Sequence, residues 1–154
     1  MIITRRSLLK TLLAGAAVAA LASALPLPAL AAPPSVAVWK AASCGCCEGW
    51  VKHMRAAGFP VQVTEMDDLS PVKARQGVPA ALQSCHTAIV DGYVLEGHVP
   101  APAVLRLLAE RPRARGLAVP GMPLSAPGMD AGADHYDVVL FGLADGGTRI
   151  FERY

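Results

Sequence analysis

Three of the four cysteines of this chain fall within one short stretch, Cys44-Gly45-Cys46-Cys47, which restricts the local fold more than any other feature. Neighbours such as Cys46 and Cys47 bridge to each other only with backbone strain, so the stretch does not suit a simple two-disulfide framework. Cys44 and Cys47 have the Cys-x-x-Cys spacing of a redox pair. Three sulfurs exceed what one redox couple needs, and thiolates favour soft metals such as Cu(I), zinc or iron–sulfur clusters. The sequence therefore predicts sulfur chemistry at this turn, through a metal or through electron transfer.

The remaining cysteine, Cys85, is followed directly by His86. We expect Cys85 to add a fourth thiolate, and His86 is a further candidate ligand because imidazole binds copper in either oxidation state. The alternative is a buried cysteine entering a strand, with Thr87 on its face and His86 on the opposite one. Met122 and Met129 lie in a loop without apolar periodicity, so they are either soft ligands for Cu(I) or side chains that fill gaps.

Zinc is the alternative metal, because four cysteines would form an all-thiolate tetrahedral site. Adjacent cysteines strain to reach one small ion, whereas each sulfur of a cluster can bridge two metals, so the pattern favours a multinuclear centre. His98 follows a predicted hairpin and is expected to be solvated, with a turn toward the site as the alternative. We identify no buried acidic or lysine partner for a Cys44–Cys47 redox pair, which weakens a thiol–disulfide function.

Residues 1–31 are predicted to be a twin-arginine signal peptide. A twin-arginine pattern in residues 4–10 precedes an apolar run over 11–25 and a small-x-small cleavage site at 29–31. An uncleaved N-terminal anchor is the alternative. Cleavage would leave residues 32–154 as one domain that is not attached to the membrane. This domain would lie in the oxidising periplasm, where a bound metal would also protect the thiols from oxidation.

The net charge of the predicted exported part argues against polyanionic partners. Removing the three basic side chains of the predicted signal from the 14 Lys and Arg of the chain leaves 11, against 12 Asp and Glu. No basic face is left to bind nucleic acid or an anionic membrane, so neither is expected as a partner.

The apolar patterns predict a thioredoxin-like α/β fold. Strands are predicted over residues 35–40, 60–66, 87–90, 93–96, 136–143 and 148–154, and helices over 47–57, 70–77 and 102–110. Ser70 is the expected N-cap of the second helix, and Leu105 and Leu108 of the third are expected to face inward. Residues 116–129 are expected to be a loop.

The resulting order, β-α-β-α-β-β-α plus a C-terminal hairpin, implies a central mixed sheet with flanking helices. It puts the cysteine turn at the N-terminus of the first helix, where free N–H groups and the helix dipole stabilise thiolates. It also brings Cys85 beside that turn.

Together these motifs resemble those of the CopG-like periplasmic copper-resistance proteins. This family was formerly catalogued as a domain of unknown function. The resemblance covers nearly the whole chain after the predicted signal. It rests on Cys-Gly-Cys-Cys followed by Trp50, on residues 84–87 and 96–100, and on the loop at 116–129. It implies a thioredoxin-like fold and a copper site, multinuclear and built on the four cysteines, with Met122 and Met129 from the loop.

The resemblance also implies copper ions as the ligand, a role in copper handling, and redox interconversion of Cu(I) and Cu(II). Other periplasmic copper-handling proteins are the expected partners. We therefore expect a periplasmic protein of copper resistance that binds Cu(I). Interconversion of Cu(I) and Cu(II) would make it a copper oxidoreductase. The alternatives are a thiol–disulfide oxidoreductase that uses Cys44 and Cys47, and a copper buffer or chaperone without turnover.

Overall fold

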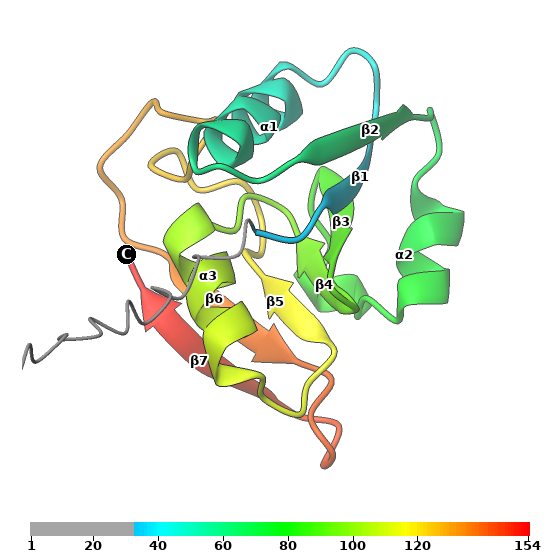
Figure 1. Cartoon of the computed structure of the whole chain (residues 1–154), viewed down its shortest axis with the longest axis vertical. Coiled ribbons are helices and arrows are strands. Elements are labelled where there is room, and N and C mark those ends of the chain that lie inside the picture. The colour runs from blue at the N-terminus through cyan, green and yellow to red at the C-terminus, as the bar shows by residue number, and fades with distance from the viewer. Residues whose placement is uncertain (1–32) are drawn as a thin grey trace, which may run out of the picture. The chain divides into compact units, whose positions relative to one another are not determined.

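Seven strands form one mixed sheet in the computed structural model, which describes residues 33–154 (Figure 1). The signal peptide predicted over residues 1–31 lies outside the described residues. The strand order across the sheet is β2-β1-β3-β4-β5-β6-β7. In chain order the elements are β1 (Val36–Lys40), α1 (Gly45–Ala56), β2 (Val61–Glu65), α2 (Ser70–Gln76), a 3₁₀ turn (Ala80–Leu82), β3 (His86–Val90), β4 (Tyr93–Glu96), α3 (Ala101–Glu110), β5 (Gly116–Ala118), β6 (Asp137–Phe141) and β7 (Thr148–Arg153).

Two helices act as crossovers between parallel strands. β1 and β2 are parallel and α1 connects them, and β4 and β5 are parallel with α3 between them. The other neighbouring strands are antiparallel, and the tight turn at Asp91-Gly92 joins β3 to β4. Parallel strands need a crossover connection, which is usually an α-helix. The expected mixed α/β architecture with flanking helices is therefore confirmed.

Alternating side chains give the sheet two apolar faces. One cross-strand row, Leu95, Leu117 and Leu140, belongs to the main core together with buried side chains of α1 and α3. Residues one position away, such as Val94 and Phe141, form a second apolar cluster with Val78 and Leu82, which follow α2. Because strand side chains alternate between faces, each polar side chain on β3 and β4 is assigned to one of these two layers.

Several predicted boundaries are corrected. α1 begins two residues earlier than predicted, which places Cys46 in its first turn. Ser70 lies inside α2, and its backbone N–H donates to the carboxylate of Asp68, so it is not the N-cap. Leu105 is 46% exposed because the core stripe of α3 runs through Val104 and Leu107 instead.

The predicted loop at 116–129 starts with the short strand β5, whose three residues are too few to show a period. Gly116 is required there because a Cβ atom at this position would lie 1.8 Å from the carbonyl oxygen of Val94. Within residues 33–154, no helix has the length and apolarity needed to cross a membrane.

Candidate metal centre

The cysteine turn lies at the junction between β1 and α1, as the sequence predicts. Cys44 is the N-cap residue of α1, with extended backbone angles and no side-chain capping bond. Cys46 and Cys47 occupy the first turn, where helical N–H groups have no intrahelical partner. The positive end of the helix dipole therefore faces the sulfur atoms, which favours thiolates over neutral thiols.

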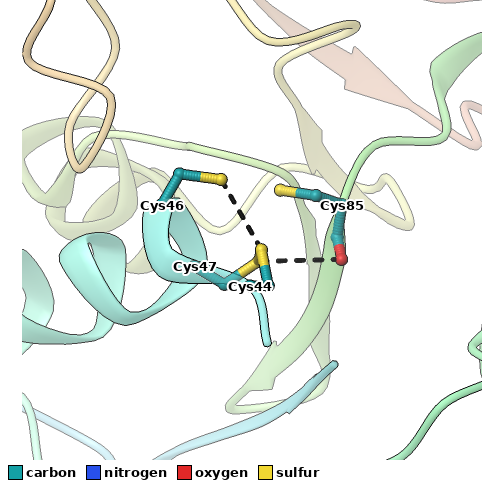
Figure 2. Close-up of side chains that lie close together, drawn as sticks. All are labelled: Cys44, Cys46, Cys47 and Cys85. Atoms are coloured by element: carbon teal, nitrogen blue, oxygen red, sulfur yellow. Dashed lines mark hydrogen bonds between the residues drawn. A yellow bond between two sulfur atoms is a disulfide. The ribbon is translucent and has the colours of Figure 1, made fainter. Parts of the chain in front are cut away.

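Two of the four sulfurs are bonded to each other in this structure. Cys44 and Cys47 form a disulfide, while Cys46 and Cys85 are free thiols (Figure 2). The Cys44 and Cys46 sulfurs are 3.5 Å apart, and the Cys47 sulfur lies 3.8 Å from the carbonyl oxygen of Cys85. The sulfur atoms of all four cysteines lie within 4.8 Å of one another. The fold thus assembles the predicted set of sulfurs, in an oxidised form in which the Cys-x-x-Cys pair is joined.

Cys85 also belongs to a second cluster, with two histidines. Its sulfur lies 3.4 Å from Nδ1 of His86 and 3.1 Å from Nε2 of His98. Both imidazoles are fully buried. The expected solvated position of His98 is therefore wrong. The alternative in which strand alternation puts Cys85 and His86 on opposite faces is also wrong. β3 begins at His86, so Cys85 precedes the strand and does not follow its alternation.

The surroundings fix the orientation of both rings. Nδ1 of His98 lies 2.8 Å from the carbonyl oxygen of Pro127, which can only accept, so Nδ1 carries the proton and Nε2 presents a lone pair to Cys85. The His86 ring packs against Trp50, with centroids 4.4 Å apart, and against His98, at 5.0 Å. Nε2 of His86 has no hydrogen-bond partner within residues 33–154.

Burial changes the acid–base behaviour of this cluster. Desolvation, with the nearby Cys46 as a second cause, raises the pKa of the Cys85 thiol to about 12. Desolvation also holds the pKa of His86 well below its ordinary value, with the neighbouring His98 adding to the shift, and lowers the pKa of His98. In the metal-free oxidised protein, Cys85 is therefore a neutral thiol facing two neutral imidazoles at neutral pH.

A buried ion pair between Lys73 and Glu96 lies on the opposite face of the sheet from the two histidines and holds the segment that carries Cys85. Glu96 is fully buried, and its carboxylate accepts hydrogen bonds from Lys73 Nζ at 2.5 Å, Ser84 N at 2.7 Å and Thr87 Oγ1 at 2.7 Å. Sequence reasoning missed this network and found no buried acid or lysine near the site. Its one signal in the sequence is that Thr87 and Glu96 are polar cross-strand partners, whereas the other pairs of the hairpin are Ala88–Leu95, Ile89–Val94 and Val90–Tyr93.

The loop after β5 closes over the start of α1. Gly128 has a φ of +88°, and a Cβ atom there would lie 2.3 Å from the Trp50 backbone nitrogen and 2.7 Å from the Cys46 carbonyl oxygen. Ser84 Oγ donates to the Gly121 carbonyl oxygen at 2.7 Å, which ties the same loop to the Cys85 segment. A glycine at position 128 therefore allows the loop backbone to lie directly on the cysteine turn.

The two methionines of this loop differ in position. Met122 is 55% exposed and lines a pocket of about 300 Å³ together with Cys85, Ser84 and Gly121. Met129 is half-buried and does not line this pocket. The structure thus places Met122 on the wall of the pocket that Cys85 also lines.

Comparisons with known proteins agree with these features. A family model described as a protein of unknown function, DUF411, matches residues 82–129, a segment that contains Cys85, His86, His98 and Met129. Two solved structures titled copper resistance protein CopG, form 2 and form 1, are each 44% identical to this chain, with TM-scores of 0.74 and 0.73. Each alignment covers 79% of this chain and 98% of the CopG chain. No curated protein gives a significant match.

Proposed function

This chain belongs to the CopG-like family of copper resistance proteins, and on that premise we propose that it binds copper through its four cysteines. The observation that carries the proposal is the convergence of four sulfurs within 4.8 Å. Thiolates are the preferred ligands of Cu(I), and adjacent Cys46 and Cys47 suit a cluster in which one sulfur bridges two ions. We therefore assign Cu(I), more than one ion per chain, to the form in which the Cys44–Cys47 disulfide is reduced.

The side chains around the sulfurs support the assignment. The N-terminus of α1 stabilises the negative charge that several thiolates would accumulate. Met122 and Met129 are proposed as thioether ligands, and His86 as an imidazole ligand. Of these, His86 has its Nδ1 3.4 Å from the Cys85 sulfur, and Met122 lines the same pocket as Cys85.

The strand order and the N-terminal sequence bear on the fold and the location that we propose. The strand order β2-β1-β3-β4, with β3 antiparallel to β1 and a cysteine turn before α1, supports a thioredoxin-like arrangement for the first part of the sheet. The twin-arginine pattern in residues 4–10 supports export to the periplasm.

A redox role in copper handling would use the Cys44–Cys47 pair. Oxidation of these two thiols to the disulfide releases two electrons and two protons, and the electrons would reduce two Cu(II) ions to Cu(I). This stoichiometry would link the disulfide found here to interconversion of the two copper states.

An anaerobic titration of the reduced protein with Cu(I), against a competing chelator, tests copper binding. We expect several coppers per chain with all four thiols masked, and fewer coppers in Cys46→Ser. Met122→Leu should weaken binding, and Met66→Leu, which changes a methionine just after β2, is the matched control. An unchanged stoichiometry in Cys46→Ser would reject the cluster.

The disulfide favours a second candidate function, a thiol–disulfide oxidoreductase. Cys44 is half-buried and Cys47 fully buried, so Cys44 would attack a substrate disulfide and Cys47 would resolve the mixed disulfide. This function predicts that disulfide reductase activity survives Cys46→Ser and Cys85→Ser but is lost in Cys47→Ser. Loss of activity in all three variants would favour the metal centre.

A further inference from the structure

A buried lysine lies at the base of the cysteine turn, and the proposed copper ligands do not include it. Lys40 is the last residue of β1 and is 2% exposed. Val36 and Val38, at alternate positions of the same strand, belong to the core that also contains Trp50 of α1. Because strand side chains alternate between faces, Lys40 extends into the layer between the sheet and α1. Lys40 is thus a buried lysine near the cysteine pair that the sequence did not reveal.

Three acceptors surround the Lys40 ammonium. Its Nζ donates to the Ala41 carbonyl oxygen at 3.3 Å and to Oε1 of Glu65 at 3.3 Å, and Oε2 of Glu48 lies 3.9 Å away. The Ala41 oxygen also accepts the backbone N–H of Cys44, at 3.1 Å. The ammonium and the Cys44 backbone share this acceptor, which places the positive charge at the start of the cysteine turn.

The positive charge of Lys40 acts inside the protein more strongly than its two carboxylate neighbours do. The side chains of Glu48 and Glu65 are 42% and 57% exposed, so water screens their charges, whereas a buried charge is screened much less. The charge of Lys40 extends to its cross-strand neighbour His86, where burial is the largest cause of the lowered pKa and Lys40 adds to it. The interior around the turn is therefore electropositive.

We propose that Lys40 sets the redox balance of the Cys44–Cys47 pair by stabilising its reduced form. The inference rests on the redox part of the proposed function. Reduction breaks the S–S bond, and two thiol groups of a reductant supply two electrons and two protons and become a disulfide. A nearby cation stabilises a cysteine thiolate but has no comparable effect on an uncharged disulfide. Because stabilising the reduced form makes a disulfide easier to reduce, Lys40 acts here as a positioning residue for charge.

Equilibration of the metal-free protein with a glutathione redox buffer tests the inference. A Cys46→Ser background leaves one cysteine pair in the turn, and acid quenching, alkylation and mass spectrometry then give its reduced fraction. Lys40→Met should lower the equilibrium constant for reduction by about 10-fold, which is about 30 mV for a two-electron couple. By Coulomb's law, one charge about 10 Å away at an effective dielectric constant of about 20 changes an equilibrium by roughly that factor.

Lys52→Met is the matched control, because it removes the same charge from an exposed position on α1. It should change the equilibrium constant by less than about twofold, since solvent screens an exposed charge. Lys40→Arg keeps the charge and should restore most of the original value. Glu65→Gln removes a negative charge from beside Lys40 and should shift the equilibrium in the opposite direction, toward reduction. A lysine with only a packing role would not give shifts of opposite sign.

Two outcomes overturn the inference. One is an equal equilibrium constant in Lys40→Met and Lys52→Met; the other is a Glu65→Gln variant that does not shift toward reduction. Far-ultraviolet circular dichroism verifies the fold of each variant, and if Lys40→Met does not fold, Glu65→Gln decides the result. Tight Cu(I) binding by the reduced protein would leave the proposed function standing in either case. A failure to bind Cu(I) would not alter the glutathione equilibrium, so the two failures can be told apart.

Discussion

The substitution Glu96→Gln tests how the Cys85 segment is held in place. The Glu96 carboxylate is fully buried and accepts hydrogen bonds from Lys73, Ser84 and Thr87. Glutamine keeps the shape but removes the charge, so the buried ammonium of Lys73 loses its counter-ion. Breaking a buried pair from one side destabilises a protein by about 3–5 kcal/mol. That is a large fraction of the roughly 5–15 kcal/mol that stabilises a typical domain.

Urea unfolding of the oxidised protein measures this loss, and a double-mutant cycle with Lys73→Met separates its causes. The double variant has no unpaired ammonium, and the glutamine oxygen can still accept from the Ser84 N–H. We therefore expect a coupling free energy of roughly 1–3 kcal/mol, with the double variant more stable than Glu96→Gln alone. A loss below about 1 kcal/mol in Glu96→Gln, or additive single effects, would refute the role of the ion pair.

Three further predictions follow from the loop, the histidines and the free thiol. Gly128→Ala should destabilise the protein by about 1–3 kcal/mol more than Gly58→Ala in urea unfolding. Both glycines have φ near +90°, but only at position 128 would a Cβ meet α1, so equal losses would contradict the packing described here. The pKa values of His53, His86 and His98 lie below the ordinary value of 6.5, so the unfolded chain binds protons first, and the free energy of unfolding should fall as pH drops below 6.5. Comparison of unfolding near pH 7.5 and near pH 5.5 checks this, and a drop that is not reduced in His53→Gln would exclude that residue as a contributor. Finally, the rate of Cys85 alkylation in the oxidised, metal-free protein, measured by mass spectrometry, should keep rising with pH up to about 12, the raised pKa of this thiol. A rate that levels off near the ordinary pKa of 9.0 would show that burial does not suppress the thiolate.

Local pattern was sufficient for most of the secondary structure. β1 lies where an apolar run rich in β formers predicted a strand, β2 where alternation did, and both hairpins lie at the predicted turns; all three predicted helices are present. The cysteine turn was placed correctly because a β-rich run before it and a helical stripe after it leave only a junction between them. β5 was missed because three residues carry no period.

The sequence by itself determined which sulfurs this protein can use, since Cys44, Cys46 and Cys47 share one turn and strand order carries Cys85 to it. Only the tertiary structure decided that His98 and Glu96 are buried. Gly97, with a φ of +71°, separates them, and each is paired with a distant segment: His98 with Pro127, Glu96 with Lys73. A polar side chain can be buried only where such a partner satisfies it, and local spacing does not record where the partner lies.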